Sequence, residues 1–96
     1  MRKYEMMYII RPDLEEEAVQ ATVEKIKSLI ENHGGEIAQN EVLGKRRLAY
    51  EIQKLRDGIY VLVQFTAPTE VIDELNHTVR ISDQIIRHLI INDIAS

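Results

Sequence analysis

The pattern of hydrophobic and polar positions divides the chain into six segments. Residues 3–10 and 59–66 alternate with a period of two, which predicts strands with one face turned inward. Residues 36–54 are predicted to form one long extended segment, and the apolar run over residues 85–91 a final strand. The inward positions of the two alternating strands are Tyr4, Met6, Tyr8, Ile10, Ile59, Val61, Val63 and Phe65.

Two segments between these strands change to helical spacing. The first is predicted over about residues 13–32, since Pro12 and the acidic residues after it favour a helix start and Gly34 a helix end. The second is predicted to begin after Pro68, with Thr69 as its N-cap. The apolar stripes are Val19, Val23, Ile26 and Ile30 in the first helix, and Val71, Ile72, Leu75 and Val79 in the second.

Two glycines mark irregular positions in the extended segments. Gly44 predicts a bulge or a bend within residues 36–54. Leu55-Arg56-Asp57-Gly58 predicts a hairpin turn, because Asp-Gly readily supplies the positive φ that short hairpin turns need.

The resulting order of elements is β-α-β-β-α-β. Two interleaved right-handed β-α-β units on one sheet predict the α+β, ferredoxin-like fold, with a four-stranded antiparallel sheet and both helices on one face. Residues 1–96 are long enough for one such domain and leave no segment unassigned.

The sheet face opposite the helices is predicted to be apolar and uncovered. Met7 and Ile9 on the first strand, with Tyr60 and Leu62 on the third, occupy the outward positions of the two alternating segments. An apolar patch of this kind marks a surface for a partner protein. Scattered surface hydrophobic residues, which are common on soluble proteins, are the alternative interpretation.

Charge separates the predicted helices from the rest of the chain. The net charge is −4, but residues 13–33 and 69–79 together carry −7, so the remaining residues carry +3. The helical side is therefore acidic, and only the other side would attract a nucleic acid.

The run Gly44-Lys45-Arg46-Arg47 concentrates three cations at one point of this acidic chain. Arginine forks match phosphate oxygens, so the cluster indicates a phosphate-binding surface. Solvated surface charges or weak salt bridges are the alternative for each cation. Charge and strand position together predict RNA contacts at Arg2, Lys3, Lys45, Arg46, Arg47, Arg80 and Arg87, and a partner interface at Met7, Ile9, Tyr50, Tyr60 and Leu62.

Catalytic chemistry finds no support in the sequence. There is no cysteine, the histidines at positions 33, 77 and 88 lack metal-site spacing, and the glycines form no phosphate loop. We expect no enzyme activity, no metal and no cofactor. No apolar stretch approaches the roughly 20 residues of a membrane span, so we expect a soluble, intracellular protein.

Two other function classes remain open at this stage. One is a regulatory ligand-binding domain of similar fold that forms homodimers through its open sheet face. The other is an acylphosphatase-like enzyme, which is disfavoured because Arg11-Pro12-Asp13-Leu14 is followed by an acidic run that would repel an anionic substrate. An RNA-recognition domain that stacks bases is disfavoured as well, because Ile59 and Val61 stand at the stacking positions.

Several motifs of the chain, in order and at the right separations, resemble one family. They are Arg2-Lys3-Tyr4-Glu5, Gly44-Lys45-Arg46-Arg47-Leu48-Ala49-Tyr50, Lys54-Leu55, Tyr60-Val61-Leu62, Glu70-Val71-Ile72-Asp73-Glu74-Leu75 and Ser82-Asp83 with Ile85-Ile86-Arg87. The family is the bacterial small-subunit ribosomal protein S6 family, and the resemblance extends to about Asn92. Glu51 stands where many members carry proline.

The resemblance implies a cytoplasmic, ribosome-bound protein without enzyme activity. It implies binding to the central domain of 16S ribosomal RNA, jointly with ribosomal protein S18 as a heterodimer. It implies no small-molecule substrate and no membrane.

Overall fold

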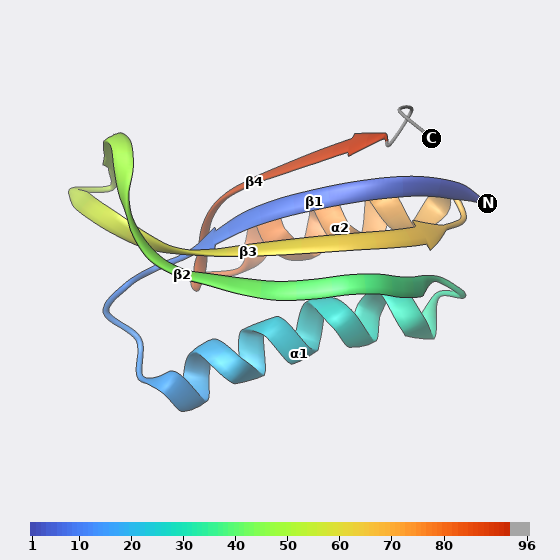
Figure 1. The fold of residues 1–96 in the computed structure, drawn as a ribbon, viewed down its shortest axis with the longest axis horizontal. Coiled ribbons are helices and arrows are strands. Elements are labelled where there is room, and N and C mark those ends of the chain that lie inside the picture. The colour runs from blue at the N-terminus through green and yellow to red at the C-terminus, as the bar shows by residue number, and fades with distance from the viewer. Residues whose placement is uncertain (93–96) are drawn as a thin grey trace.

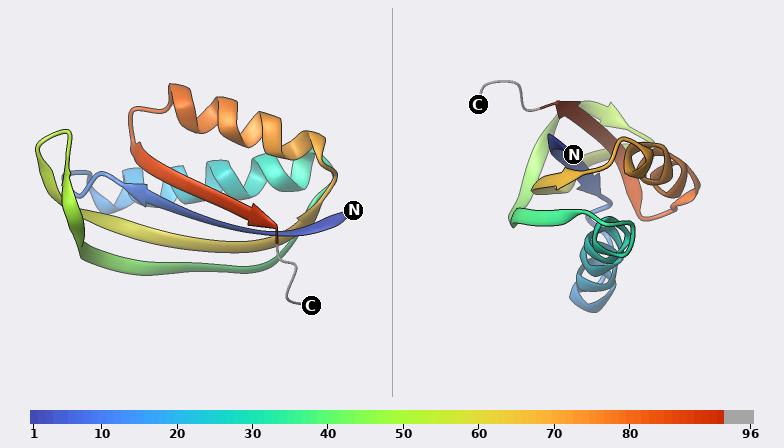
Figure 2. Two further views of the ribbon diagram at one scale, coloured as in Figure 1. Left: turned by 90° about the horizontal axis from the view of Figure 1, so that it is seen from above. Right: turned by 90° about the vertical axis from the view of Figure 1, so that its right-hand side faces the viewer.

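The computed structural model describes residues 1–92 and has the predicted order of elements (Figure 1). These are β1 (Arg2–Ile10), α1 (Glu16–Asn32), β2 (Glu36–Ile52), β3 (Leu55–Ala67), α2 (Glu70–Ile81) and β4 (Ile85–Asn92). The strands form one sheet in the order β2-β3-β1-β4, and every neighbouring pair is antiparallel. Both helices lie on the same side of this sheet (Figure 2), which confirms the predicted ferredoxin-like fold.

The core lies between the helices and the inward positions of β1 and β3. Met6, Tyr8, Ile10 and Val61 are fully buried there. The Tyr4 and Phe65 rings stack with their centroids 5.6 Å apart, which joins the two central strands at one end. The predicted helix stripes are buried against this layer, with Ile72 packed at its margin. The period-two and helical patterns therefore predicted the core correctly.

The start of α1 was predicted three residues too early. Pro12, Asp13 and Leu14 form a turn and a bend, and the helix begins at Glu16. The Arg11 side chain donates to the Asp13 carboxylate at 3.0 Å, and the same hydrogen bond lowers the pKa of Asp13. Leu14 packs against the core. Because this contact holds Asp13 in the loop, the Asp13 carboxylate does not interact with the first turn of α1.

The hairpin turn between β2 and β3 was predicted three residues too late. The turn residues are Gln53 and Lys54, with φ of 50° and 66°, and Ile52 pairs with Leu55 across them. Positive φ at both central positions is the geometry of a two-residue hairpin turn whose twist matches the strands. Asp57 lies within the ladder opposite Arg47, so it takes no part in the turn.

The predictions for Gly44 and Gly34 are confirmed, and the prediction for Thr69 is confirmed only in part. Gly44 has φ of 100° at a shift in the β2–β3 register, which confirms the predicted irregularity. Gly34, with φ of 89°, follows α1 as expected. Thr69 occupies the N-cap position of α2, but its backbone is helical and its side chain makes no capping hydrogen bond. The predicted N-cap position was therefore correct, but the predicted capping hydrogen bond is absent.

The fully buried Tyr8 hydroxyl has no hydrogen-bond partner among the residues that the structure describes. Burial raises the pKa of this phenol, so it stays neutral. A buried polar group without a partner costs about 1–3 kcal/mol. Tyr8→Phe is therefore expected to increase the free energy of unfolding by about 1 kcal/mol, measured by urea denaturation. A loss of stability in Tyr8→Phe would contradict this expectation.

Candidate RNA and protein interface

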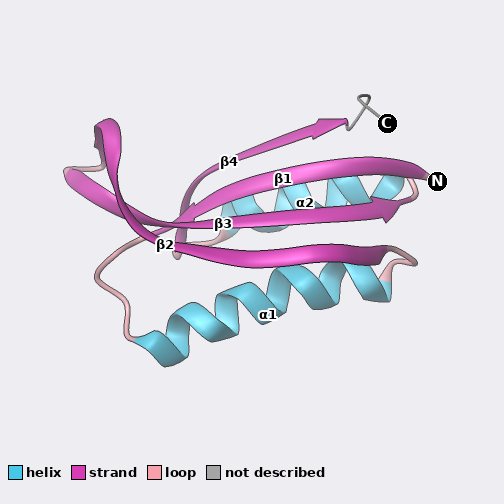
Figure 3. Ribbon diagram, viewed as in Figure 1, coloured by secondary structure: helices cyan, strands magenta, loops and turns pink. Residues whose placement is uncertain are grey.

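The residues after Gly44 in β2 and the first residues of β3 form a strongly charged hairpin, residues 45–57, which we call the basic hairpin. It carries Lys45, Arg46, Arg47, Lys54 and Arg56 against Glu51 and Asp57, a net charge of +3 on a chain of net charge −4. The hairpin bends away from the line of the other strands and toward the β4 side of the sheet (Figure 1). Both of its arms remain strands through this bend (Figure 3).

Register in the basic hairpin is interrupted by a large bulge. Arg47 pairs with Asp57 and Ile52 pairs with Leu55, so residues 48–51 of β2 lie opposite Arg56 alone. A cavity of about 270 Å³ lies at this bulge, lined by Arg47, Leu48, Glu51 and Arg56, and we call it the hairpin pocket. Bulges re-aim side chains and are frequent beside functional sites.

One contact ties the basic hairpin to the opposite edge strand of the sheet. The Arg87 guanidinium of β4 lies over the Tyr50 ring, 5.2 Å from its centroid. A cation–π contact at an exposed site such as this contributes about 0.5–1 kcal/mol. Tyr50 is still 58% exposed, so its other face remains available. Two residues predicted for different partners, RNA and protein, are therefore in contact.

The curled hairpin also covers part of the open sheet face. Ile9 and Leu48 are both buried, at 8% and 6% exposure, and both lie against Gly58. Ile9 was predicted to contribute to an exposed partner surface. In the structure Ile9 is instead covered by the hairpin and exposes little of its own surface.

The remaining open face carries an apolar patch, formed by the half-buried Met7, Tyr60 and Leu62 and the exposed Leu89 and Ile91. Register places Leu62, Met7 and Leu89 side by side across three strands, while Tyr60 precedes this row and Ile91 follows it. Leu89 is 63% exposed and Ile91 47% exposed. An apolar cavity of about 150 Å³ lies beside Met7 and Leu89. We call these five residues the open-face patch.

Leu89 and Ile91 were not among the residues predicted for the open apolar face. The parity of Arg87, Leu89 and Ile91 along residues 85–91 was the available signal. The flanking isoleucines obscured it, and a register shift at Ile9 and Ile10 changes which β4 residues share a face with β1. The prediction therefore needed the pairing of β1 with β4.

A carboxylate stands at the border of the open-face patch. The Gln64 side-chain amide donates to Glu5 at 3.1 Å, and register places Glu5 between Gln64 and Ile91. The patch is thus apolar at its middle, with an anion at one end and Arg87 at the other.

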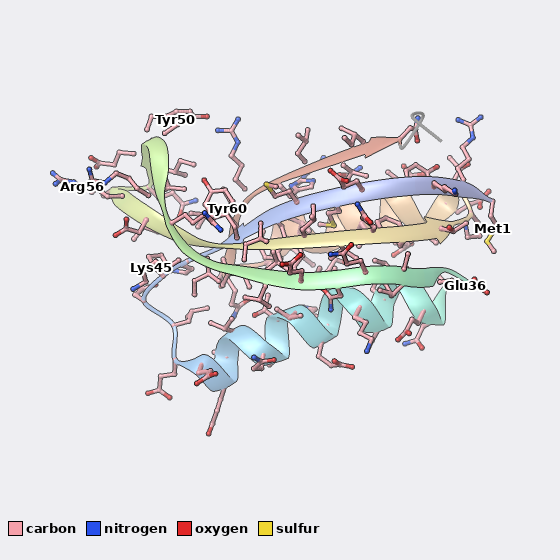
Figure 4. All side chains as sticks on the ribbon, viewed as in Figure 1. Met1, Glu36, Lys45, Tyr50, Arg56 and Tyr60 are labelled. Carbon is pink, nitrogen blue, oxygen red and sulfur yellow. The ribbon has the colours of Figure 1, made fainter. Side chains whose placement is uncertain are left out.

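The predicted RNA-binding cations do not form one group. Figure 4 places Lys45, Tyr50 and Arg56 at one end of the molecule and Met1 at the other, so Arg2 and Lys3 lie far from the basic hairpin. Arg80 is exposed on α2, on the helical side of the sheet. The structure brings together only Lys45, Arg46 and Arg47 in the hairpin, with Arg87 joined through Tyr50.

Two of the three histidines make hydrogen bonds within the fold. His88 donates from Nε2 to the Asn76 side-chain oxygen at 2.8 Å, and burial together with the nearby Arg80 charge lowers its pKa. His33 donates from Nδ1 to the Leu29 carbonyl at the end of α1, at 2.8 Å. Within residues 1–92, no three metal-ligating side chains gather at one point. Neither described helix is long and apolar enough to cross a membrane.

These features define a small α+β protein with a basic hairpin beside an apolar sheet face, a surface suited to assembly with other macromolecules. The family model for ribosomal protein S6 matches residues 3–92. The small ribosomal subunit protein bS6 of Desulforamulus reducens is 52% identical over 93 residues, which covers 97% of this chain and 98% of that one. The bS6 protein of Clostridium acetobutylicum is also 52% identical, over 96% and 97% of the two chains.

A solved structure agrees with these relatives. The crystal structure of 30S ribosomal protein S6 from Thermotoga maritima superposes with a TM-score of 0.94 at 35% identity, over 98% of this chain and 89% of that one. The chain belongs to the ribosomal protein S6 family. It is a structural component of the small ribosomal subunit in the cytoplasm and not an enzyme, so the acylphosphatase alternative is rejected.

Proposed function

We propose that this protein binds the central domain of 16S ribosomal RNA jointly with ribosomal protein S18, as one half of a heterodimer. The observation that carries the proposal is the adjacency of two unlike surfaces. The basic hairpin, with net charge +3, is in contact with the apolar sheet face through Tyr50 and Arg87. Phosphates favour the first surface and an apolar protein segment the second.

The charge distribution supports joint binding rather than binding by this chain alone. Nonspecific affinity for RNA depends on the number of phosphates that cations neutralise, and this chain has a net charge of −4. A cationic partner seated on the open-face patch would extend the basic surface of the hairpin across the sheet. Arg46, Arg47 and Arg87 would then lie near the boundary between the RNA and the partner.

The homodimer alternative predicts a different assembly from the same face. A regulatory domain would pair with a second copy of itself, whereas the proposed protein stays monomeric until S18 is added. Sedimentation of the purified chain, alone and with S18, separates these two outcomes.

The proposal is tested by replacing both Arg46 and Arg47 with alanine. Both side chains are exposed, so the fold and the free energy of unfolding should be retained. The affinity of the chain–S18 pair for a central-domain RNA fragment is expected to fall by about tenfold or more, because charge-assisted hydrogen bonds contribute about 1.5–3 kcal/mol each. Filter binding at physiological salt measures this change.

A matched control removes equal charge from the acidic side of the protein. Lys25 and Lys27, both on α1, are replaced by alanine in the control, which should bind RNA as the unmodified chain does. RNA affinity that is unchanged in the arginine variant, or reduced equally in the lysine control, would contradict a role for the cluster. Failure of the unmodified pair to bind the fragment would contradict the proposed function itself.

A further inference from the structure

The hairpin pocket contains a cation that the predicted RNA-binding set omits, Arg56. Its side chain and that of Arg47 line the same cavity of about 270 Å³ from the two arms of the hairpin. The residues are nine positions apart in sequence and are brought together only by the register of β2 with β3. From this geometry we propose that Arg47 and Arg56 together bind one phosphate group of the RNA backbone. The inference rests on the proposed function and adds a specific site to it.

The bulge is the structural reason that this pocket exists. Between the Arg47–Asp57 pair and the Ile52–Leu55 pair, residues 48–51 have only Arg56 opposite them. A continuous ladder would place Arg47 and Arg56 on neighbouring positions with opposite faces. The bulge breaks this alternation, and the two side chains line one cavity together with Leu48.

The two guanidinium groups are free to meet an anion. In the part of the chain that the structure describes, the only ion pair within 4.0 Å joins Arg11 to Asp13. Neither Arg47 nor Arg56 is therefore held by Glu51, although Glu51 lines the same pocket. Two arginine forks present several N–H donors in fixed planes, which suits the tetrahedral oxygens of a phosphate.

The chemistry of the lining favours a backbone phosphate over a whole nucleotide. Beside the arginines, the pocket has one leucine and one carboxylate and no aromatic ring on which a base could stack. The nearby Tyr50 ring does not line the pocket. With two arginines against the Glu51 carboxylate, the lining carries a net charge of +1, which matches the single negative charge of one backbone phosphate.

The test uses substitutions that remove charge and keep side-chain polarity. Arg56→Gln is expected to reduce the affinity of the chain–S18 pair for the central-domain RNA fragment about tenfold. The slope of log affinity against log salt should fall by about one unit, as expected for one lost phosphate contact. Lys54→Gln is the matched control: it removes the same charge from the basic hairpin but outside the pocket, so its loss of affinity should be clearly smaller than that of Arg56→Gln.

A double-mutant cycle tests whether the two arginines act on one phosphate. Arg47→Gln and Arg56→Gln should each reduce affinity about tenfold, and the double variant by clearly less than the hundredfold product, because the two residues share one ligand. Losses that multiply fully would overturn the shared site. An Arg56→Gln variant that behaves like Lys54→Gln would also overturn it, while the proposed function would stand as long as the unmodified pair binds RNA. If the unmodified pair does not bind, both fail.

Two further arms distinguish the sources of the anion. The free chain is titrated with inorganic phosphate while the amide signals of residues 48–51 are followed by NMR. An RNA effect of Arg56→Gln, with or without a phosphate response in these amides, supports a backbone phosphate. A phosphate response without an RNA effect overturns the assignment to RNA. Weaker binding of Arg56→Gln to S18 in the absence of RNA would assign the pocket to a protein carboxylate and overturn it as well.

Discussion

Replacing Gly58 by alanine is expected to lower the free energy of unfolding by about 2–3 kcal/mol, because overpacking at a closely packed position costs that much. A Cβ on Gly58 would lie 2.2 Å from the Ile9 Cγ2 atom and 3.4 Å from the Leu48 Cδ2 atom. Ile9 Cγ2 branches directly from the Ile9 Cβ, so it cannot move aside as the end of a long side chain can. Urea denaturation of the variant measures the loss.

The steric origin of this loss is separated from a backbone effect by two further variants. Gly44→Ala meets no atom within 4 Å but has φ of 100°, so its expected cost of about 1–2 kcal/mol comes from the backbone alone. Adding Ile9→Ala should relieve the Gly58→Ala clash and leave the cost of Gly44→Ala unchanged. Equal effects of Ile9→Ala in both backgrounds would contradict the close approach at Gly58.

The fold followed from local patterns because its core is built on them. Tyr8 and Val61 are buried at positions that the period of two predicts, and Ile26 and Leu75 at positions that helical spacing predicts. The boundaries were less predictable because they depend on individual contacts. The turn is the clearest case: Gln53-Lys54 has no glycine or asparagine to signal positive φ, whereas Asp57-Gly58 does.

Gly58 shows why the turn was misplaced. Its lack of a side chain suggested a backbone requirement, yet it does not have positive φ and lies in the β2–β3 ladder opposite Arg46. The requirement comes from Ile9, which is 49 positions away in sequence and packs against it. A local sequence motif cannot predict that two segments far apart in the sequence pack closely at a glycine.

The candidate site was predictable in kind but not in arrangement. The cluster at Lys45–Arg47 was evident because three consecutive cations stand out in an acidic chain. Arg56 could not be distinguished from the other cations of the chain, since its place in the hairpin pocket depends on a bulge whose size cannot be predicted from the residue pattern. The contact between Tyr50 and Arg87 depends in the same way on the bend of the hairpin across the sheet.

Replacing Leu89 by glutamate is expected to weaken association with S18 by more than about a hundredfold, if the open-face patch is the partner interface as proposed. Leu89 pairs with Met7, which pairs in turn with Leu62, so it belongs to the central row of the patch. Residues near the centre of an interface can contribute about 2 kcal/mol or more, and a carboxylate buried there without a partner adds a large penalty. Calorimetric titration with S18 measures the change.

Ile81→Glu provides the matched control for this prediction. Ile81 is 65% exposed, nearly the same as Leu89 at 63%, but it lies at the end of α2, on the helical side of the sheet. Both variants should keep the free energy of unfolding of the unmodified chain, since neither side chain belongs to the core. Loss of S18 binding in Leu89→Glu alone would locate the partner on the open face, because the two variants differ only in which side of the sheet carries the new charge. Equal S18 affinity in the two variants would exclude the open-face patch as the interface.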